Sequence, residues 1–323
     1  MDRITFPYRS ATHLPLLHVI AESGAWEKQG LEVEYDRPIS SSEAHASVTS
    51  GDIDFVGGNH VSTYGRRARG DDWVYLGQTV NYVPGRTLIV RSDSGIAGMA
   101  DLRHKTVGTV GHHPGLNDWL FLKQHGLDVD RDEVALVQQK FPPTINKANS
   151  MAEAPLWHLV RDKEVDAVFI VPPGTTQAEQ AGLKAIEIDP MPMIYFTTIS
   201  TSMRLAQQRP EMVERFLKGV MEGIHFFKTQ PQRSIDVIRN RYANEGVLDD
   251  AMAAITYKCL AEAFEPKLYP TPQAIANVYV EGVRQDKDAA RMNPMELWDL
   301  HFIRRIDDSG FVNELYRDKA ASR

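Results

Sequence analysis

The chain has 323 residues, 42% of them hydrophobic and 24% charged, a length and composition typical of a globular protein with two lobes. A formal net charge of −7 argues against a nucleic-acid-binding surface, and no apolar run approaches the ~20 residues that cross a bilayer. The one cysteine, Cys259, excludes an internal disulfide and a two-cysteine metal motif. It falls in a helical pattern typical of a buried thiol.

The first 90 residues alternate between strand and helix patterns. Strands are predicted at residues 3–8, 31–35, within 51–58, and at 73–80 and 87–90. Helices are predicted at 14–21, 40–50 and about 61–68, the second opened by a capping box of Ser40 and Glu43. The first strand begins almost directly after Met1, with no charged or apolar leader before it, so we expect a cytoplasmic protein. The alternative is a periplasmic protein whose leader has been removed.

The middle of the chain, residues 92–190, again alternates between strand and helix patterns. A β-branched strand at 106–110 runs into Gly111, His112, His113 and Pro114, and a helix pattern follows. The free N–H groups of a helix start attract an anion, and ligands of open α/β sheets bind at the carboxyl ends of strands. A further strand at 134–138 and a helix at 151–161 precede KEVDAVFIV, which echoes GDIDFVGG of residues 51–58. The echo predicts that the two lobes share one supersecondary plan.

Beyond residue 190 a strand at 193–200 leads into a helical tail. Helices are predicted at about 210–229, 234–243, 249–264, 271–284 and 294–306. The pattern predicts an α/β protein of two lobes, the first completed by the C-terminal helices. We place lobe 1 at residues 1–91 plus 193–323 and lobe 2 at 92–192, with hinge crossings near Arg91 and Pro192.

Five short motifs occur in order along the chain: ESGAWEKQGLEVEY, SGDIDFVGGN, SDSGIAGMADLRHKTVG, KEVDAVFI and PEMVERFLKG. In sequence and order they resemble the type II periplasmic-binding-protein superfamily. More narrowly, they resemble the branch of nitrate/sulfonate/taurine-binding proteins and thiamine-pyrimidine-synthase-like proteins, over residues 3–240. The resemblance implies a ligand in a cleft between the lobes, held by strand-end loops and helix starts. The matching loops are residues 8–13, 39–43, 57–62, 111–117 and about 172–175.

Histidines gather in these loops. Of the eleven histidines, five fall in or next to the expected cleft: His13, His45, His60, His112 and His113. Imidazole titrates near neutral pH, which suits general acid/base catalysis, and the catalytic candidates are His13, His60, His112 and His113. The alternative is that the rings donate hydrogen bonds to an anion. No cofactor is expected. A Zn²⁺ or Fe²⁺ site of His13, His60 and His113 is a minor alternative, without an HxH or HxxxH spacing to support it.

The remaining candidates are contacts to the ligand. Arg9 can fork onto a carboxylate or sulfonate, Tyr8 can stack on a planar group, and the glycine pair permits close approach beside Asn59. The full set of expected substrate-binding residues is Tyr8, Arg9, Ser10, Thr12, His45, Gly58, Asn59, Gly111, Gly115, Asn117 and Pro173.

Enzymes of the same branch indicate which activities the resemblance implies. A biphenyl sulfinate desulfinase resembles YRSATHLPLL and the glycine-pair region, and its histidine lies where His45 stands here, but its cysteine falls where this chain has residues 10–13. The cysteine-rich iron motif of the thiamine-pyrimidine synthases is absent. Dihydroxyphthalate decarboxylases, which act on aromatic carboxylates, share SDSGI and runs like PMPMIYFTT.

Two functions follow. The first is a cytoplasmic, cofactor-independent enzyme, decarboxylase-like or a hydrolase, which acts on a small anionic aromatic or heterocyclic substrate through histidine acid/base chemistry. The alternative is the solute-binding component of an ABC importer, with a permease as its partner.

Overall fold

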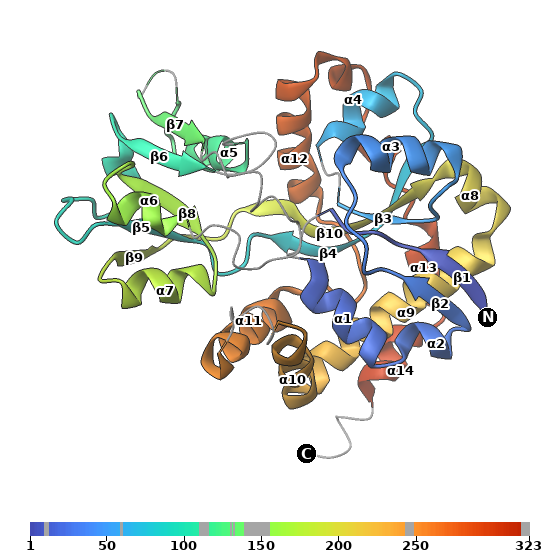
Figure 1. Cartoon of the computed structure of the whole chain (residues 1–323). Helices are drawn as coiled ribbons and strands as arrows, with labels where there is room; N and C mark the ends of the chain where they lie inside the picture. Colours follow the sequence, from blue (N-terminus) through green and yellow to red (C-terminus); the bar gives the residue numbers. More distant parts are fainter. Residues whose placement is uncertain are drawn as a thin grey trace. The chain divides into compact units, whose positions relative to one another are not determined.

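A computed structural model of the chain describes residues 1–9, 13–58, 61–109, 116–129, 131, 133–138, 156–242 and 249–317. The chain divides into two compact units (Figure 1). Unit 1 comprises Met1–Tyr82, Pro192–Asn244 and Leu260–Arg323, and unit 2 comprises Val83–Met191 and Glu245–Cys259. The predicted lobes differ from these units at residues 83–91, whose strand pairs inside unit 2, and at 245–259. In the described part of the chain, no helix is long and apolar enough to cross a bilayer.

The strands of unit 1 form two sheets that backbone hydrogen bonds join. β1 (Asp2–Thr5) pairs in parallel with β2 (Leu31–Glu34), and β10 (Pro192–Ser202) lies antiparallel between β3 (Val56–Gly57) and β4 (Trp73–Tyr82). The amide of Phe55 donates to the Thr5 carbonyl over 3.0 Å, and Tyr8 forms a parallel bridge with Gly57. The spatial order is therefore β2, β1, β3, β10, β4.

Unit 2 repeats this plan. Its sheet has the order β7 (Ala135–Gln138), β6 (Thr106–Thr109), β8 (Ala167–Ile170), β5 (Thr87–Val90), β9 (Lys184–Glu187). β6 pairs in parallel with β7 and β8, and β5 pairs antiparallel with β8 and β9. The β1–β3 and β6–β8 pairs of the two units therefore correspond.

The sequence echo occupies equivalent positions in the two units. In unit 1 the Asp54 carboxylate accepts hydrogen bonds from the Thr5 amide over 2.9 Å and from its hydroxyl over 3.1 Å. The Asp54 amide donates to the Thr5 hydroxyl over 2.8 Å. Asp166 and Thr106 make the same three bonds in unit 2, each over 2.9 Å. The predicted repeat is thus a shared strand-to-strand clamp.

The N-terminal helices of unit 1 pack on a long C-terminal one, α9 (Pro210–Thr229). α1 (Leu14–Glu22) and α2 (Ala25–Lys28), blue in Figure 1, lie along it. Glycines permit this approach, because a Cβ on Gly219 would lie 2.4 Å from the Trp26 ring and one on Gly223 would lie 2.4 Å from Ile20. The ring of Phe216 on α9 stacks on Phe55 with centroids 4.0 Å apart, which anchors the helix to the sheet.

A second helical layer covers the β4–β10 side of unit 1. It holds α3 (Ser41–Ser50), α4 (Ser62–Ala68) and α12 (Pro272–Gln285), around buried Tyr64, Trp73 and Tyr75. Further helices of this unit are α8 (Met203–Gln208), α10 (Pro231–Tyr242) and α14 (Phe311–Arg317). The helix predicted at 294–306 is wrong as one element. It is a 3₁₀ turn, η5 (Pro294–Leu297), and α13 (His301–Asp308), because Trp298 between them bridges to Tyr75 of β4.

The helices described in unit 2 are α5 (Leu116–Gln124), α6 (Trp157–Arg161) and α7 (Gly174–Gln180), with a 3₁₀ turn, η2 (Met99–Leu102). α11 (Asp250–Ala263) begins in unit 2 and ends in unit 1. The buried residues of α6, among them Trp157 and Val160, pack with Ile89 and Val168 of the sheet. α7 and β9 were not predicted.

Candidate functional site

More than half of the predicted site residues lie outside the described part of the chain. These are Ser10, Thr12, Asn59, His60, Gly111, His112, His113 and Gly115. Asn117 belongs to α5, with its side chain outside the description. The described candidates are Tyr8, Arg9, His13, His45 and Gly58 in unit 1, and Pro173 in unit 2.

Unit 1 brings several of its candidates together where β1 and β3 end. Tyr8 bridges both Pro38 and Gly57, and the Gly58 amide donates to the Thr198 carbonyl over 3.1 Å. A Cβ on Gly58 would lie 3.2 Å from Cβ and Cγ of Arg9 and 3.4 Å from Cε1 of His13. Gly58 also has a φ of 102°, a backbone conformation that favours glycine. The predicted glycine position is therefore where Arg9 and His13 meet.

We call this group the Arg9 cluster. Its members come from the loop after β1, the end of β3 and the middle of β10: Tyr8, Arg9, His13, Gly57, Gly58, Phe196 and Thr197.

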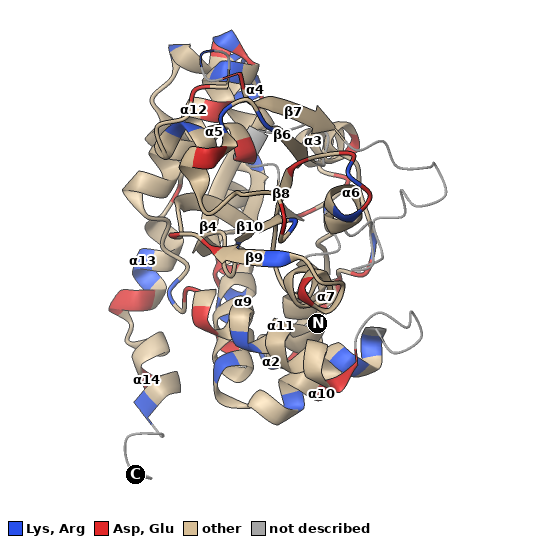
Figure 2. Ribbon diagram, turned by 90° about the vertical axis from the view of Figure 1, so that its left-hand side faces the viewer, with Lys and Arg blue, Asp and Glu red and all other residues tan. Residues whose placement is uncertain are grey.

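Arg9 carries the electrostatics of the cluster. Arg9 is only partly exposed, its Nε atom is buried, and no described side chain accepts a hydrogen bond from that atom. Burial lowers the pKa of Arg9 to about 10, with Tyr75 acting in the opposite direction. No acidic side chain of the described residues forms an ion pair with this guanidinium. On helices such as α9 and α13, by contrast, acidic and basic residues occur together (Figure 2). Arg9 is therefore a partly buried cation without an acidic partner among the described residues.

His13 is the N-cap residue of α1 and is almost fully buried, with 4% of its surface exposed. Its Nδ1 lies 3.2 Å from the hydroxyl of Thr197. Its ring stacks on Phe196 with centroids 5.7 Å apart and planes 13° apart. The imidazole is held on two sides by consecutive residues of β10.

His45 lies on the buried face of α3. It is 2% exposed, its Nε2 is 3.1 Å from the Ser62 hydroxyl, and its ring centroid is 4.4 Å from that of Trp73. Burial, followed by the positive charges of Arg66 and Arg9, lowers its pKa to about 3. His45 is thus a neutral core residue at ordinary pH.

The remaining described candidate belongs to unit 2. Pro173 follows β8 and is the N-cap of α7. Beside it, the hydroxyls of Thr87 and Thr175 are 2.8 Å apart. The loop after β8 is the counterpart, in the repeated plan, of the Gly58 loop after β3.

Sequence reasoning missed a charged group in unit 2. Arg86 immediately precedes β5 and pairs with Asp118 in the first turn of α5, with side chains 8% and 15% exposed. Its guanidinium lies over the rings of Phe121 and Phe169, 4.9 and 5.0 Å from their centroids. Single charged residues next to a strand give no pattern, so no sequence signal distinguishes this pair from surface charge.

Sequence reasoning also missed the role of β10 and its partner strand. Phe196 and Thr197 were assigned only to a strand. Gln78 and Thr79 of β4 carry polar groups into the buried part of that strand, residues 73–80. Two consecutive polar residues inside WVYLGQTV were the available signal.

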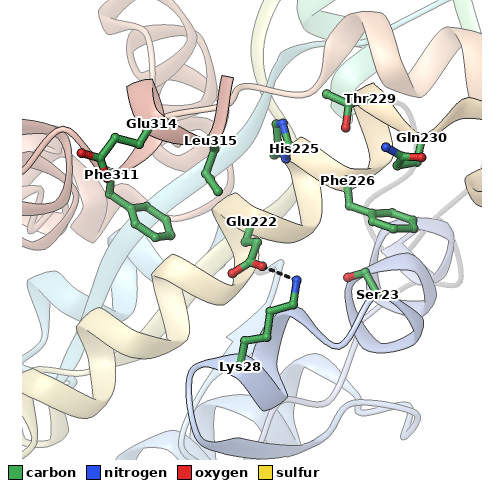
Figure 3. Close-up of a pocket in the computed structure, with 10 residues that line it drawn as sticks. All are labelled: Ser23, Lys28, Glu222, His225, Phe226, Thr229, Gln230, Phe311, Glu314 and Leu315. Carbon is green, nitrogen blue, oxygen red and sulfur yellow. Dashed lines mark hydrogen bonds and ion pairs between the residues drawn. The ribbon is translucent and has the colours of Figure 1, made fainter. Parts of the chain in front are cut away.

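A cavity of about 410 Å³ in unit 1 contains none of the predicted residues (Figure 3). Its wall includes His225 and Phe226 of α9 and Phe311 of α14. The charge of Lys28 in this cavity is already satisfied, since its Nζ lies 2.6 Å from Glu222. The Arg9 cluster is therefore the stronger candidate for binding an anion. Among the described residues, no group of three or more His, Cys, Asp or Glu side chains is placed to hold a metal ion.

The chain is similar in structure to sulfonate-binding proteins. The chain matches the aliphatic sulphonate-binding protein SsuA of Escherichia coli at 15% identity and a TM-score of 0.65, over 92% of this chain and 99% of that one. The alkanesulfonate-binding protein SsuA of Xanthomonas axonopodis pv. citri, bound to MOPS, matches at 15% identity and a TM-score of 0.60, over 93% and 99% of the two chains.

An enzyme is similar to the same degree. A mutant of the desulfurization enzyme DszB in complex with biphenyl-2-sulfinic acid matches at 16% identity and a TM-score of 0.63, over 95% of this chain and 100% of that one. These likenesses confirm the predicted type II periplasmic-binding-protein-like fold. No curated protein sequence matches this chain. The NMT1/THI5-like family matches residues 11–234, more than half of the sequence, and the chain belongs to this family.

Proposed function

We propose that the protein binds a small organic monoanion whose acidic group pairs with Arg9, and that it serves as the solute-binding component of an ABC importer. The observation that carries the proposal is the Arg9 guanidinium, which is partly buried without an acidic partner among the described residues. Moving a cation out of water costs free energy unless an anion or hydrogen-bond acceptors compensate it. A carboxylate, sulfonate or sulfinate provides both.

The named ligands of the structural relatives agree with this choice of anion. The two SsuA proteins are named for sulfonates, and the DszB mutant holds a sulfinic acid. All three names contain a sulfur oxoacid, which a guanidinium can recognise by paired hydrogen bonds. Under this proposal the protein delivers its ligand to a permease and acts on the outer side of the cytoplasmic membrane.

The enzymatic alternative is a decarboxylase-like lyase or a hydrolase that acts in the cytoplasm. One observation favours it, since the imidazole of His13 and the stem of Arg9 flank the same glycine, Gly58. Other features favour binding. His13 is only 4% exposed. The one cysteine of the chain, Cys259, belongs to α11 and is not a member of the Arg9 cluster. A general acid must reach its substrate, whereas a positioning residue need not.

A ligand screen by thermal shift tests the proposal. Benzenesulfonate and benzoate are the anionic probes, and benzenesulfonamide is the neutral probe of similar shape. A ligand at about 100 times its Kd stabilises the folded state by about 2.7 kcal/mol. We expect both anions, and not the sulfonamide, to raise the Tm of the wild-type protein.

Variants assign the effect to Arg9. Arg9→Met removes the charge and keeps most of the apolar stem, and Arg37→Met is the matched control at an arginine with 50% of its side chain exposed. We expect Arg9→Met to abolish the shift and Arg37→Met to retain it. Equal stabilisation of Arg9→Met and wild type would contradict the proposal. Release of sulfite from benzenesulfinate, which consumes a water molecule, would favour a hydrolase, and release of CO₂ from a dihydroxybenzoate would favour a decarboxylase-like lyase.

A further inference from the structure

β10 is irregular where it passes the Arg9 cluster. Its pairing with β4 changes register between Pro192 and Tyr195, and again between Tyr195 and Thr198. Phe196 has a φ of 65°, in the left-handed region that a bulky aromatic residue rarely adopts. Such conformations persist only where surrounding contacts enforce them, and they are concentrated at functional sites.

Two buried polar residues of β4 hold this bulge. The Gln78 amide donates to the carbonyls of Val80 and Tyr195, each over 2.5 Å, and accepts from the Thr198 hydroxyl over 2.6 Å. The Thr79 hydroxyl donates to the Thr197 carbonyl over 2.9 Å and accepts from the Thr197 amide over 3.1 Å. Gln78 and Thr79 are fully buried, so these bonds satisfy the backbone groups that the bulge removes from the regular ladder.

The bulge places two consecutive side chains on His13. The Phe196 ring stacks on the imidazole, and the ring of Phe264 supports Phe196 from another direction, with centroids 5.5 Å apart at 65°. The Thr197 hydroxyl lies 3.2 Å from Nδ1 of His13. In a regular strand consecutive side chains point to opposite faces, so both could not reach one ring.

A glycine completes the arrangement. A Cβ on Gly57 would lie 3.1 Å from both His13 Nδ1 and Thr197 Cγ2, so a larger residue at this position would require His13 or Thr197 to move by a few tenths of an ångström. His13 in turn lies against Gly58, whose other neighbour is Arg9. A continuous series of contacts therefore runs from Gln78 and Thr79 to the anion-binding cation.

We propose that the β10 bulge is a positioning device for His13, in which Phe196 fixes the plane of the imidazole and the Thr197 hydroxyl holds its Nδ1 through a hydrogen bond. Its effect on ligand affinity rests on the function proposed above. Phe196 and Thr197 are then positioning residues of the Arg9 cluster, which act through His13.

A ligand-free measurement tests the device first. ¹⁵N chemical shifts of the His13 ring, read by long-range ¹H–¹⁵N NMR, report its tautomer and protonation state. We compare wild type, Thr197→Val and the control Thr201→Val, which removes a buried hydroxyl of the same strand that donates to the Asp54 carbonyl over 2.6 Å. We expect Thr197→Val alone to shift the ring signals. Unchanged signals in Thr197→Val, or equal shifts in both variants, would overturn the proposal.

The backbone of the bulge is tested at Phe196. Glycine usually destabilises a strand relative to alanine, but at positive φ the order reverses. We expect Phe196→Gly to unfold at a higher urea concentration than Phe196→Ala. The usual order, with the alanine variant more stable, would overturn the left-handed bulge.

The affinity for benzenesulfonate tests whether the β10 bulge affects ligand binding. We expect Thr197→Val to weaken benzenesulfonate binding about tenfold, the effect of one hydrogen bond, and Thr201→Val to leave it unchanged. Shifted His13 signals with unchanged affinity would overturn the connection to the ligand. If wild-type protein binds no benzenesulfonate while the His13 and Phe196 results hold, the proposed function fails and the positioning device stands.

Discussion

Moderate acid is expected to destabilise this protein, because two histidines are buried in their neutral form. His45 and His18 are 2% and 5% exposed. Burial lowers the pKa of His45 to about 3 and that of His18 to about 4. The positive charges of Arg66 and Arg9 contribute to the low pKa of His45. Arg241 lowers the pKa of His18, whereas Asp36 and Glu22 raise it. Below pH 6.5 the unfolded chain therefore binds protons that the folded chain excludes.

The magnitude follows from the difference between folded and unfolded pKa values. A histidine with an unfolded pKa of about 6.5 and a folded pKa of 4 or less removes about 2 kcal/mol of stability between pH 7.5 and pH 5. The two residues together remove about 4 kcal/mol, a large share of the 5–15 kcal/mol typical of a domain. Because the pKa of each histidine is lower in the folded state than in the unfolded state, this contribution to stability is complete above the unfolded pKa of about 6.5 and is lost as the pH falls below it.

Urea denaturation of wild type and His45→Gln at pH 7.5 and pH 5 measures this effect. His45→Gln costs stability at pH 7.5 through lost packing on Trp73, but the gap to wild type narrows by about 2 kcal/mol at pH 5. His104→Gln is the control, at a side chain that is 66% exposed and pairs with Glu133. A gap between His45→Gln and wild type that stays the same at both pH values would refute the reasoning.

Three further predictions concern stability, and urea denaturation measures each of them. Thr5→Val and Thr106→Val each remove the hydroxyl of one of the two equivalent clamps, so we expect the free energy of unfolding to fall by a similar amount, about 1–3 kcal/mol, in both variants. A fall in only one variant would contradict the equivalence of the clamps. Arg86→Met leaves the Asp118 carboxylate buried without its partner and costs about 3–5 kcal/mol. Adding Asp118→Leu recovers most of that loss, and a double variant no more stable than the single one would count against the buried pair. Lys228→Met costs about 1–2 kcal/mol, because the Lys228 ammonium donates to the carbonyls of Ala261 and Phe264 at the end of α11 over 2.6 and 2.9 Å; unchanged stability would show that these bonds contribute nothing.

The elements that could be predicted from the sequence have strong local signals. The capping box of Ser40 and Glu43 is present, with the Ser40 hydroxyl accepting from the Glu43 amide over 3.2 Å. The echo of GDIDFVGG in KEVDAVFIV marked the shared plan of the units, because each acidic residue clamps a threonine on the neighbouring strand. Helix 294–306 was wrong because the contact of Trp298 with β4 is tertiary and leaves no local pattern.

The candidate site was predictable only in part. Arg9 and Gly58 could be placed together, because loops after neighbouring parallel strands meet at one edge of a sheet. The strained backbone of Phe196 could not, since a left-handed conformation at a non-glycine residue follows from the contacts around it. His45 lies in the core beside Trp73, while His60, His112 and His113 fall outside the described residues, so their meeting with His13 at one site stays a prediction.

The most direct test of the central claim is a calorimetric titration of wild type, Arg9→Lys and Arg9→Met with benzenesulfonate. A hydrogen bond to a charged group contributes about 1.5–3 kcal/mol, so Arg9→Met is expected to bind about 10 to 100 times more weakly, with Arg9→Lys between the two. Equal affinity of wild type and Arg9→Met, at retained thermal stability, would contradict the assignment of Arg9 as the anion-binding residue.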